Sequence, residues 1–190
     1  MKIKRKKKKY SKKLFNELIL FYLLSRNGYF FEYEASFLLK VSSRTLRRYI
    51  REINKTCVLH RDGRGLEPFT QSGYKSYHVN LDFYNKETDP FKDALNPQIV
   101  ILPIGFCQRH PKGLDSKNQH IVRLTRCALL LHCVDNEIRK LDECELIEPK
   151  DVVIECAKYY FVEMNFDFSS KTFIRDMSIV TDVISFMKDK

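Results

Sequence analysis

The chain has 190 residues, of which 44% are hydrophobic and 31% are charged, and its formal net charge is +10. This length and apolar content are enough for a folded core, which excludes a wholly disordered polypeptide. The longest uninterrupted apolar run, 18–24, has seven residues, far fewer than the roughly 20 that span a bilayer, so no membrane segment is expected.

The positive charge is concentrated at one end of the chain. Residues 1–64 contain 18 Lys and Arg against 5 Asp and Glu, whereas residues 65–190 contain 16 against 19. Nine of the cations lie in residues 1–13, which contain no acid. Because such a block repels itself, we expect 1–13 to be a disordered basic arm. Its cations could neutralise phosphates, so we expect the arm to follow a DNA backbone. A solubilising tail and a nuclear or membrane-surface address are the alternatives.

Residues 14–24 predict a first helix, which ends near Gly28 as a C-terminal stop. Asn16 and Glu17 interrupt its apolar stretch, and no small-residue cleavage pattern follows it. The basic start is therefore not interpreted as a secretory signal, and a soluble cytoplasmic protein associated with the nucleoid is expected.

A second, short helix is predicted over residues 31–39, with Lys40 at the turn that follows and Val41 filling the corner. Ser42 or Ser43 is suited to cap the third helix, because its hydroxyl can accept a bond from an unpaired backbone N–H. The third helix is predicted over residues 42–54.

This third helix has two chemically different sides. At about 100° per residue, Leu46, Ile50 and Ile53 share one stripe, and the opposite stripe carries Arg44, Arg47, Arg48 and Arg51. A planar guanidinium can bond phosphate oxygens or the O6/N7 edge of guanine, as a DNA-reading helix requires. A solvated surface helix is the alternative.

The segment from Gly28 to Arg48, with the core V-S-S-R-T-L-R-R, resembles the winged helix-turn-helix of bacterial DeoR-like and Mga-like transcriptional regulators. The resemblance covers about residues 12–80. It departs from the usual pattern at Ser36, where such families usually carry Ala, and at Lys40, where they commonly carry Gly. It implies that helix 42–54 lies in the major groove of double-stranded DNA, with a β-hairpin wing beside it.

The wing is predicted from two β-prone runs, 57–60 and 74–79, joined by a loop that contains glycine. Arg61, Arg64 and Lys75 are its candidates for phosphate contact, and ordinary hairpin charges are an equal alternative. Domain 14–80 would then be the DNA-binding unit.

The rest of the chain divides into a Pro-containing connector, 81–118, with a strand expected at 98–102, and a helical domain, 119–190. Within this domain we predict a first helix, a second over 151–164 and a last one. The first helix is expected to bury Ile121, Leu124, Ala128, Leu131 and Ile138, and the last to bury Phe173, Met177, Val180, Ile184 and Met187. These helices are expected to pack or to form a homodimer.

The sequence of residues 168–177 resembles that of residues 41–50, at an offset of 127 positions. From Asp151 onward, however, there are five Lys and Arg against seven Asp and Glu. This favours a degenerate second helix-turn-helix, kept for packing or self-association, over a second DNA-binding module.

The six cysteines, at 57, 107, 127, 133, 144 and 156, are spaced irregularly without a C-x-x-C pair, so they are interpreted as small buried side chains. No metal and no cofactor are predicted. No phosphate loop, nucleophile elbow or carboxylate pair with a nearby His is found, so catalysis is not expected.

The sequence therefore predicts a mainly α fold with a small β wing (α+β), and a sequence-specific DNA-binding transcriptional regulator. The alternative is a non-catalytic winged-helix interaction module that binds protein or nonspecific nucleic acid, for example in plasmid or phage replication. The predicted DNA contacts are Ser42, Ser43, Arg44, Thr45, Arg47, Arg48, Arg51, Arg61, Arg64 and Lys75.

Overall fold

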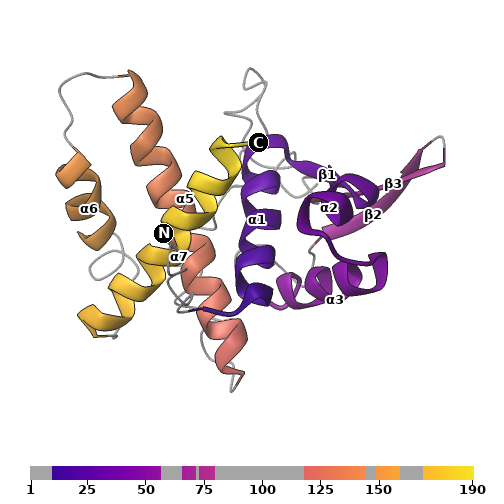
Figure 1. Cartoon of the computed structure of the whole chain (residues 1–190), viewed down its shortest axis with the longest axis horizontal. Helices are drawn as coiled ribbons and strands as arrows, with labels where there is room; N and C mark the ends of the chain where they lie inside the picture. The colour runs from indigo at the N-terminus through magenta and orange to yellow at the C-terminus, as the bar shows by residue number, and fades with distance from the viewer. Residues whose placement is uncertain (1–9, 57–65, 72, 80–117, 144–148, 159–168) are drawn as a thin grey trace, which may run out of the picture.

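The computed structural model describes residues 10–56, 66–71, 73–79, 118–143, 149–158 and 169–190 (Figure 1). These residues are mainly helical with a small antiparallel sheet, which confirms the coarse prediction of a mainly α fold with a small β component. In chain order the elements are α1 (Lys12–Asn27), β1 (Tyr29–Phe31), α2 (Glu32–Leu39), α3 (Ser43–Ile53), β2 (Leu66–Gln71), β3 (Tyr74–Val79), α5 (Gln119–Glu143), α6 (Pro149–Lys158) and α7 (Ser170–Lys188).

Both ends of α1 have the caps that their residues favour. The Ser11 hydroxyl accepts a hydrogen bond from the Leu14 N–H at 3.2 Å, so the helix begins at Lys12. The predicted arm boundary at residue 13 is therefore wrong, because its last residues belong to the cap and first turn; residues 1–9 lie outside the described ranges. Gly28 has φ 74° and its N–H donates to the Leu24 carbonyl at 2.8 Å, which confirms the predicted stop.

The sheet has the strand order β1-β3-β2, and all its pairs are antiparallel. The prediction of the wing's first strand is wrong: the strand that pairs with β3 is Leu66–Gln71, and residues 57–60 lie outside the described ranges. Pro68 obscured this strand in the sequence, yet β2 is an edge strand, where the missing N–H is tolerated. Strand β1 was not predicted, because Phe31 was assigned to the second helix; its backbone is extended (φ −82°, ψ 140°).

Helix α1 lies between two groups of elements, with α2, α3 and the sheet on one side and α5 and α7 on the other (Figure 1). Its Leu14, Leu18, Ile19, Leu20 and Leu24 are each at most 1% exposed. The buried hydrophobic side chains of both groups form one continuous cluster with those of α1. The N-terminal and C-terminal parts therefore share a core.

The C-terminal helices bury the sides that their periodicity predicted. Buried side chains include Ile121, Leu124, Ala128 and Leu131 of α5 and Phe173, Val180 and Ile184 of α7. Met177 and Met187 are partly buried against the same core. The side chain at position 138, the connector 81–117 with its expected strand, and residues 159–164 of the predicted 151–164 helix lie outside what the structure describes.

Three of the six cysteines lie in the described part of the chain. Cys127, Cys133 and Cys156 are free and buried, as predicted, and the Sγ atoms of Cys133 and Cys156 are 3.6 Å apart. Cys57, Cys107 and Cys144 lie outside it. No helix formed by the described residues is long and apolar enough to cross a membrane.

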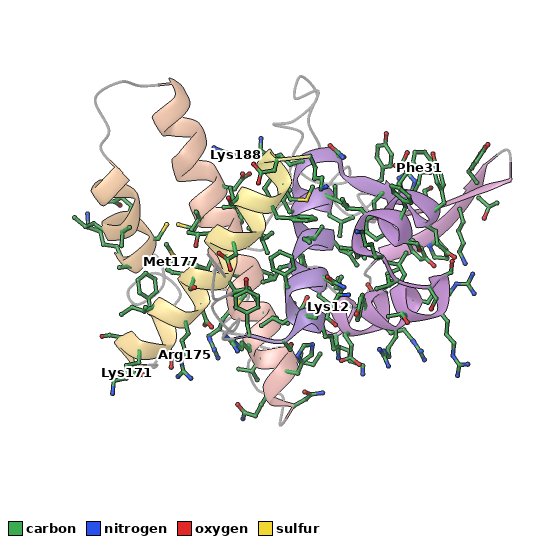
Figure 2. All side chains as sticks on the ribbon, viewed as in Figure 1. Lys12, Phe31, Lys171, Arg175, Met177 and Lys188 are labelled. Atoms are coloured by element: carbon green, nitrogen blue, oxygen red, sulfur yellow. The ribbon has the colours of Figure 1, made fainter. Side chains whose placement is uncertain are left out.

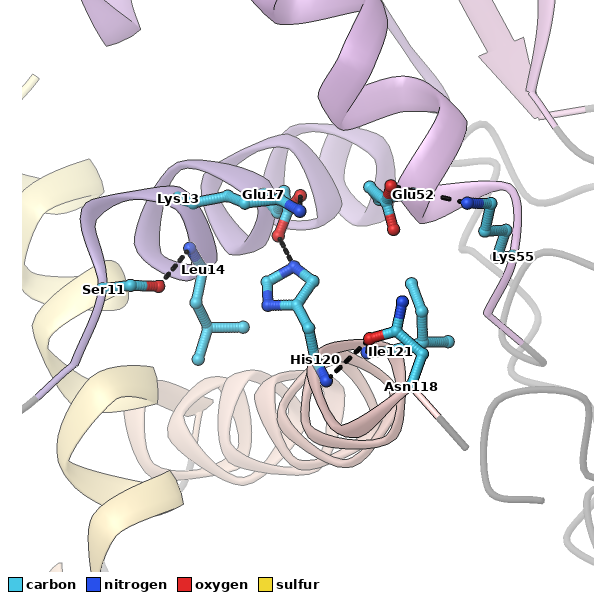
Figure 3. A network of polar contacts seen from close by, with 9 residues as sticks. All are labelled: Ser11, Lys13, Leu14, Glu17, Glu52, Lys55, Asn118, His120 and Ile121. Atoms are coloured by element: carbon cyan, nitrogen blue, oxygen red, sulfur yellow. Dashed lines mark hydrogen bonds and ion pairs between the residues drawn. The ribbon is translucent and has the colours of Figure 1, made fainter. Parts of the chain in front are cut away.

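A buried carboxylate links α1 to α5 (Figure 3). The Glu17 side chain is 0% exposed; its Oε2 lies 2.7 Å from His120 Nε2, and its Oε1 lies 3.7 Å from Lys13 Nζ. Burial raises the pKa of Glu17 above its ordinary value of 4.5 and the nearby Glu52 adds to this, although His120 and Lys13 oppose the shift. The ionised form is thus less favoured in the folded chain than in the unfolded chain.

We expect the replacement Glu17→Gln to become increasingly stabilising, relative to the native chain, as the pH rises from about 4.5 towards 7. A carboxyl whose folded pKa is raised contributes stability that is fully present below its unfolded pKa and is lost as the pH rises through the folded pKa. Urea unfolding at several pH values measures the difference in free energy. The control is Glu155→Gln, at an exposed position of α6; a difference for Glu17→Gln that does not grow with pH would contradict the expectation.

Candidate nucleic-acid interface

The start of α3 is fixed by a turn and a cap. Lys40 adopts the left-handed conformation (φ 51°), and its N–H donates to the Phe37 carbonyl at 3.2 Å. Ser42, rather than Ser43, is the cap: its hydroxyl accepts from the Thr45 N–H at 3.3 Å and lies 3.1 Å from the Thr45 hydroxyl. These contacts end α2 and begin α3 within three residues.

The two sides of α3 are those that the sequence predicted. Leu46, Ile50 and Ile53 are buried, and Tyr49, which was not predicted, is buried with them. The four arginines are exposed. Figure 2 shows nitrogen-tipped side chains that extend from α3 on the side away from α2.

Three of the four arginines, Arg44, Arg48 and Arg51, make no hydrogen bond or ion pair with any residue that the structure describes. At about 100° per residue they fall within roughly 60° of one another around α3. Their guanidinium groups therefore form one cationic stripe, unpaired within the described part of the chain, opposite the buried side of the helix.

Arg47 is engaged differently. Its Nη2 lies 2.9 Å from Glu32 Oε1 and its Nε lies 3.4 Å from Glu32 Oε2, so the guanidinium holds the first residue of α2. The side chain is still 55% exposed. The structure thus places Arg47 at the edge of the stripe, with a structural partner of its own.

Glu32 connects three elements. Its carboxylate accepts hydrogen bonds from Arg47 of α3 and from the Tyr77 hydroxyl of β3 at 3.0 Å, and Lys75 Nζ of β3 lies 3.9 Å away. Burial alone would raise the pKa of Glu32, but the hydrogen bonds from Arg47 and Tyr77 and the charges of Arg47 and Lys75 lower it overall. Burial, together with this hydrogen bond, raises the pKa of Tyr77 to about 12. The carboxylate therefore stays ionised and sets the position of α3 relative to the sheet.

Sequence reasoning missed Glu32 and Tyr77 as parts of the interface. An acid at the start of α2 has no local partner, because Arg47 lies 15 residues and Tyr77 45 residues further along the chain. The strand that carries Tyr77 was predicted, but not which side chains of the hairpin would face α2. No signal in the sequence alone joins these groups.

The segment predicted to be a wing is only partly described. Lys75, one of its predicted phosphate contacts, faces Glu32 and lies 5.6 Å from the centre of the Tyr77 ring. Arg61 and Arg64 lie outside the described ranges. A row of ring contacts attaches the hairpin to β1 and α2; it consists of His78–Tyr29 at 5.2 Å, Tyr29–Phe31 at 5.6 Å, Phe31–Tyr33 at 5.8 Å and Tyr33–Tyr74 at 5.6 Å between centroids.

The repeat in α7 keeps the burial pattern of α3 without its charge. At the offset of 127 positions, the buried Leu46 and Ile53 correspond to Phe173 and Val180, which are also buried. The positions that correspond to the four arginines are exposed but carry Lys171, Ile174, Arg175 and Ser178. The outer side of α7 thus has two cations where α3 has four.

The arrangement on α3 is suited to binding anions. Unpaired guanidinium groups form bidentate bonds with phosphates and with guanine, and the N-terminus of α3 beside Ser42 and Ser43 adds a positive dipole end. Within the described ranges, no three His, Cys, Asp or Glu side chains lie together as a metal site requires. Comparison of the chain with protein-family models, curated proteins and solved structures finds no match.

We expect Glu32→Ala to lower the free energy of unfolding by about 1–3 kcal/mol, because it leaves the buried Tyr77 hydroxyl without its acceptor. The folded pKa of Glu32 is lower than its ordinary 4.5, so its contribution is present above about pH 4.5 and is lost as the pH falls through the folded pKa. Urea unfolding at neutral and acidic pH measures both effects. Glu34→Ala, at an exposed position of the same helix, is the control; equal losses in the two variants would show that Glu32 has no special role.

Proposed function

We propose that the chain is a sequence-specific, double-stranded DNA-binding transcriptional regulator that places α3 in the major groove. The observation that carries this proposal is the stripe of Arg44, Arg48 and Arg51, which has no partner among the described residues, on a helix whose other side is buried. A major groove admits one helix, and the helix contributes side chains to the base edges from one stripe.

The order of the elements supports the same proposal. A helix, a short strand, two helices joined by a tight turn and a hairpin follow one another, and β1 pairs with the hairpin strand β3. This is the arrangement expected of a winged helix-turn-helix, the fold of the DeoR-like and Mga-like regulators that residues 28–48 resemble. In that arrangement the hairpin lies beside the groove, and the candidates for contact with the DNA backbone are Arg61, Arg64 and Lys75. The helix end nearest the phosphates carries Ser42, Ser43 and Thr45.

The structure contains one chain and shows no dimer. Exposed apolar side chains on the C-terminal helices nevertheless favour a homodimer. Val153 and Ile154 of α6 are 49% and 50% exposed, and Ile174 of α7 is 63% exposed. A second copy that covers these side chains would present paired α3 helices to half-sites about 34 Å apart. Sedimentation of the full chain with and without DNA tests this part of the proposal.

One observation favours the alternative, a non-catalytic interaction module. Phe37, Tyr33 and Tyr74 are 86%, 54% and 59% exposed, and exposed aromatic side chains are frequent in protein-binding surfaces. Under this alternative the chain binds a protein or an anionic polymer without distinguishing base sequences.

Selection of bound duplexes from a random-sequence library, followed by salt titration of a selected and a scrambled duplex, distinguishes the two functions. A regulator enriches a recurring motif, and its preference persists as salt weakens binding to both duplexes. Equal affinity for the two duplexes at every salt concentration would leave only the alternative.

We expect Arg48→Ala to reduce the preference for the selected duplex by roughly 5- to 150-fold, the range for one bidentate base contact. The matched control is Arg175→Ala, the exposed arginine at the corresponding position of the repeat in α7. Arg48→Ala is not expected to change stability, since Arg48 has no partner in the described part of the chain. If Arg175→Ala had the larger effect, α7 and not α3 would be the DNA-binding helix.

Deletion of residues 2–9, which contain seven cations, is expected to weaken binding to all duplexes alike and to reduce the salt dependence of the affinity. An arm that only neutralises phosphates contributes no base preference. The ratio of affinities for the selected and scrambled duplexes should therefore stay constant, and a change in that ratio would assign base recognition to the arm.

A further inference from the structure

A cavity of about 530 Å³ lies across α1, at the C-terminal ends of α2 and α7. Figure 1 shows α1 between these two helices. The volume falls within the roughly 300–1,000 Å³ of small-molecule sites. Apolar side chains from all three helices line it: Phe15, Ile19, Leu38, Leu39 and Phe186.

The charged side chains that line the cavity are all cationic. Lys12 of α1, Lys40 at the end of α2 and Lys190 after α7 belong to the lining, and no Asp or Glu among the described residues does. The hydroxyl of Tyr10, another lining residue, donates to Asp182, which lies outside the lining. The cavity therefore combines an apolar wall with a positive potential.

Asn16, in the same lining, has an unsatisfied polar group. The residue is 3% exposed, and its amide Nδ2 has no hydrogen-bond partner among the described residues. A buried amide donor without an acceptor is unfavourable, and a bound water, ion or ligand is one explanation for such a group. The Nδ2 atom is inaccessible in this conformation, so an acceptor in the cavity would satisfy it only after the Asn16 side chain turns towards the cavity.

We propose that this cavity binds a small amphipathic organic anion, a molecule with an apolar body and one acidic group. The acidic group supplies acceptor oxygens for the lysine ammonium groups and for the Asn16 amide. The apolar body is covered by the aromatic and leucine side chains of the wall. A neutral lipid would form no ion pair with the ammonium groups, and a cation would be repelled.

The position of Lys40 makes this site an effector site, an extension that rests on the proposed function. Lys40 forms the left-handed turn between α2 and α3, and Val41, Ser42 and then α3 follow directly. A ligand that holds the Lys40 ammonium acts on the backbone that sets the direction of α3. Its binding should therefore change the affinity for DNA, and DNA should change the affinity for the ligand by the same factor.

Isothermal titration of the full chain with decanoate, and separately with 1-decanol, tests the site. We expect one decanoate per chain, and binding of decanol at least tenfold weaker, because only the anion pairs with the lysines. Lys12→Gln combined with Lys40→Gln should weaken decanoate binding at least tenfold. The matched control is Lys188→Gln, an exposed lysine of α7 outside the lining (Figure 2), which should leave binding unchanged.

Two further variants separate binding from folding. Leu38→Trp fills the cavity and should abolish decanoate binding while the melting temperature stays near that of the native chain, since Leu38 is only partly buried. Asn16→Leu removes the unsatisfied amide, so it should raise the melting temperature and weaken decanoate binding. Absence of saturable decanoate binding to the native chain would overturn the proposal, as would binding that all these variants retain or equal binding of decanol.

Measurements of DNA binding distinguish the proposed ligand site from the proposed regulator function. Affinity for the selected duplex is measured with and without saturating decanoate, in the native chain and in Leu38→Trp. A shift in the native chain that Leu38→Trp lacks supports the effector role, and no shift in either overturns that role alone. If no duplex is preferred but decanoate binds and the variants behave as expected, the site stands and the proposed regulator function fails.

Discussion

Burial of α1 on all of its sides is the constraint on which the rest of the structure depends. The helix carries so many consecutive apolar residues that one covering layer would leave half of them in water, and the structure covers it with α2, α3 and the sheet on one side and with α5 and α7 on the other. Because the two covering groups share this helix, they also share a core, and α3 is connected to the C-terminal helices through packed side chains. The candidate DNA-binding elements are therefore not an independently packed unit.

Within this frame the charges of α3 are divided between two tasks. Four guanidinium groups on one side of an 11-residue helix repel one another, and the ion pair of Arg47 with Glu32 offsets part of that repulsion. Glu32 is also bonded to Tyr77 of β3, so the pair fixes the angle between α3 and the hairpin. Arg44, Arg48 and Arg51 make no such contact with the described residues, and this leaves their forks available for a partner outside the chain. Structural and binding roles are thus carried by adjacent residues of one helix.

The sequence predicted what depends on local chemistry and missed what depends on distant contacts. The stop at Gly28, the turn at Lys40, a serine cap for α3 and its buried stripe follow from residues within one or two turns of each other, and the structure confirms them. Strand β1 could not be predicted from its three residues, because it exists only by pairing with β3, more than 40 residues away. The first hairpin strand was misplaced, because Pro68 is unusual in a strand and is tolerated here only at an edge. The Glu32 cluster was missed because, like β1, it depends on contacts with residues far along the chain. The uninterrupted apolar run at 18–24 was interpreted only as too short to span a bilayer, and its burial between two groups of elements was not predicted.

The turn at Lys40 is the place where a change at the cavity could reach α3. Among the described residues, Lys40 is the only non-glycine residue with a positive φ, a conformation that costs roughly 1–2 kcal/mol for an ordinary side chain. Surrounding contacts must supply that energy, and they include the hydrogen bonds that close α2 and the packing of Leu39 against the core. Because the cost is small, a second conformation of the turn lies within the range that the binding energy of a ligand can populate or suppress. Most of α1 is buried whereas Lys40 is exposed, so a ligand in the proposed site would move the turn more readily than this helix.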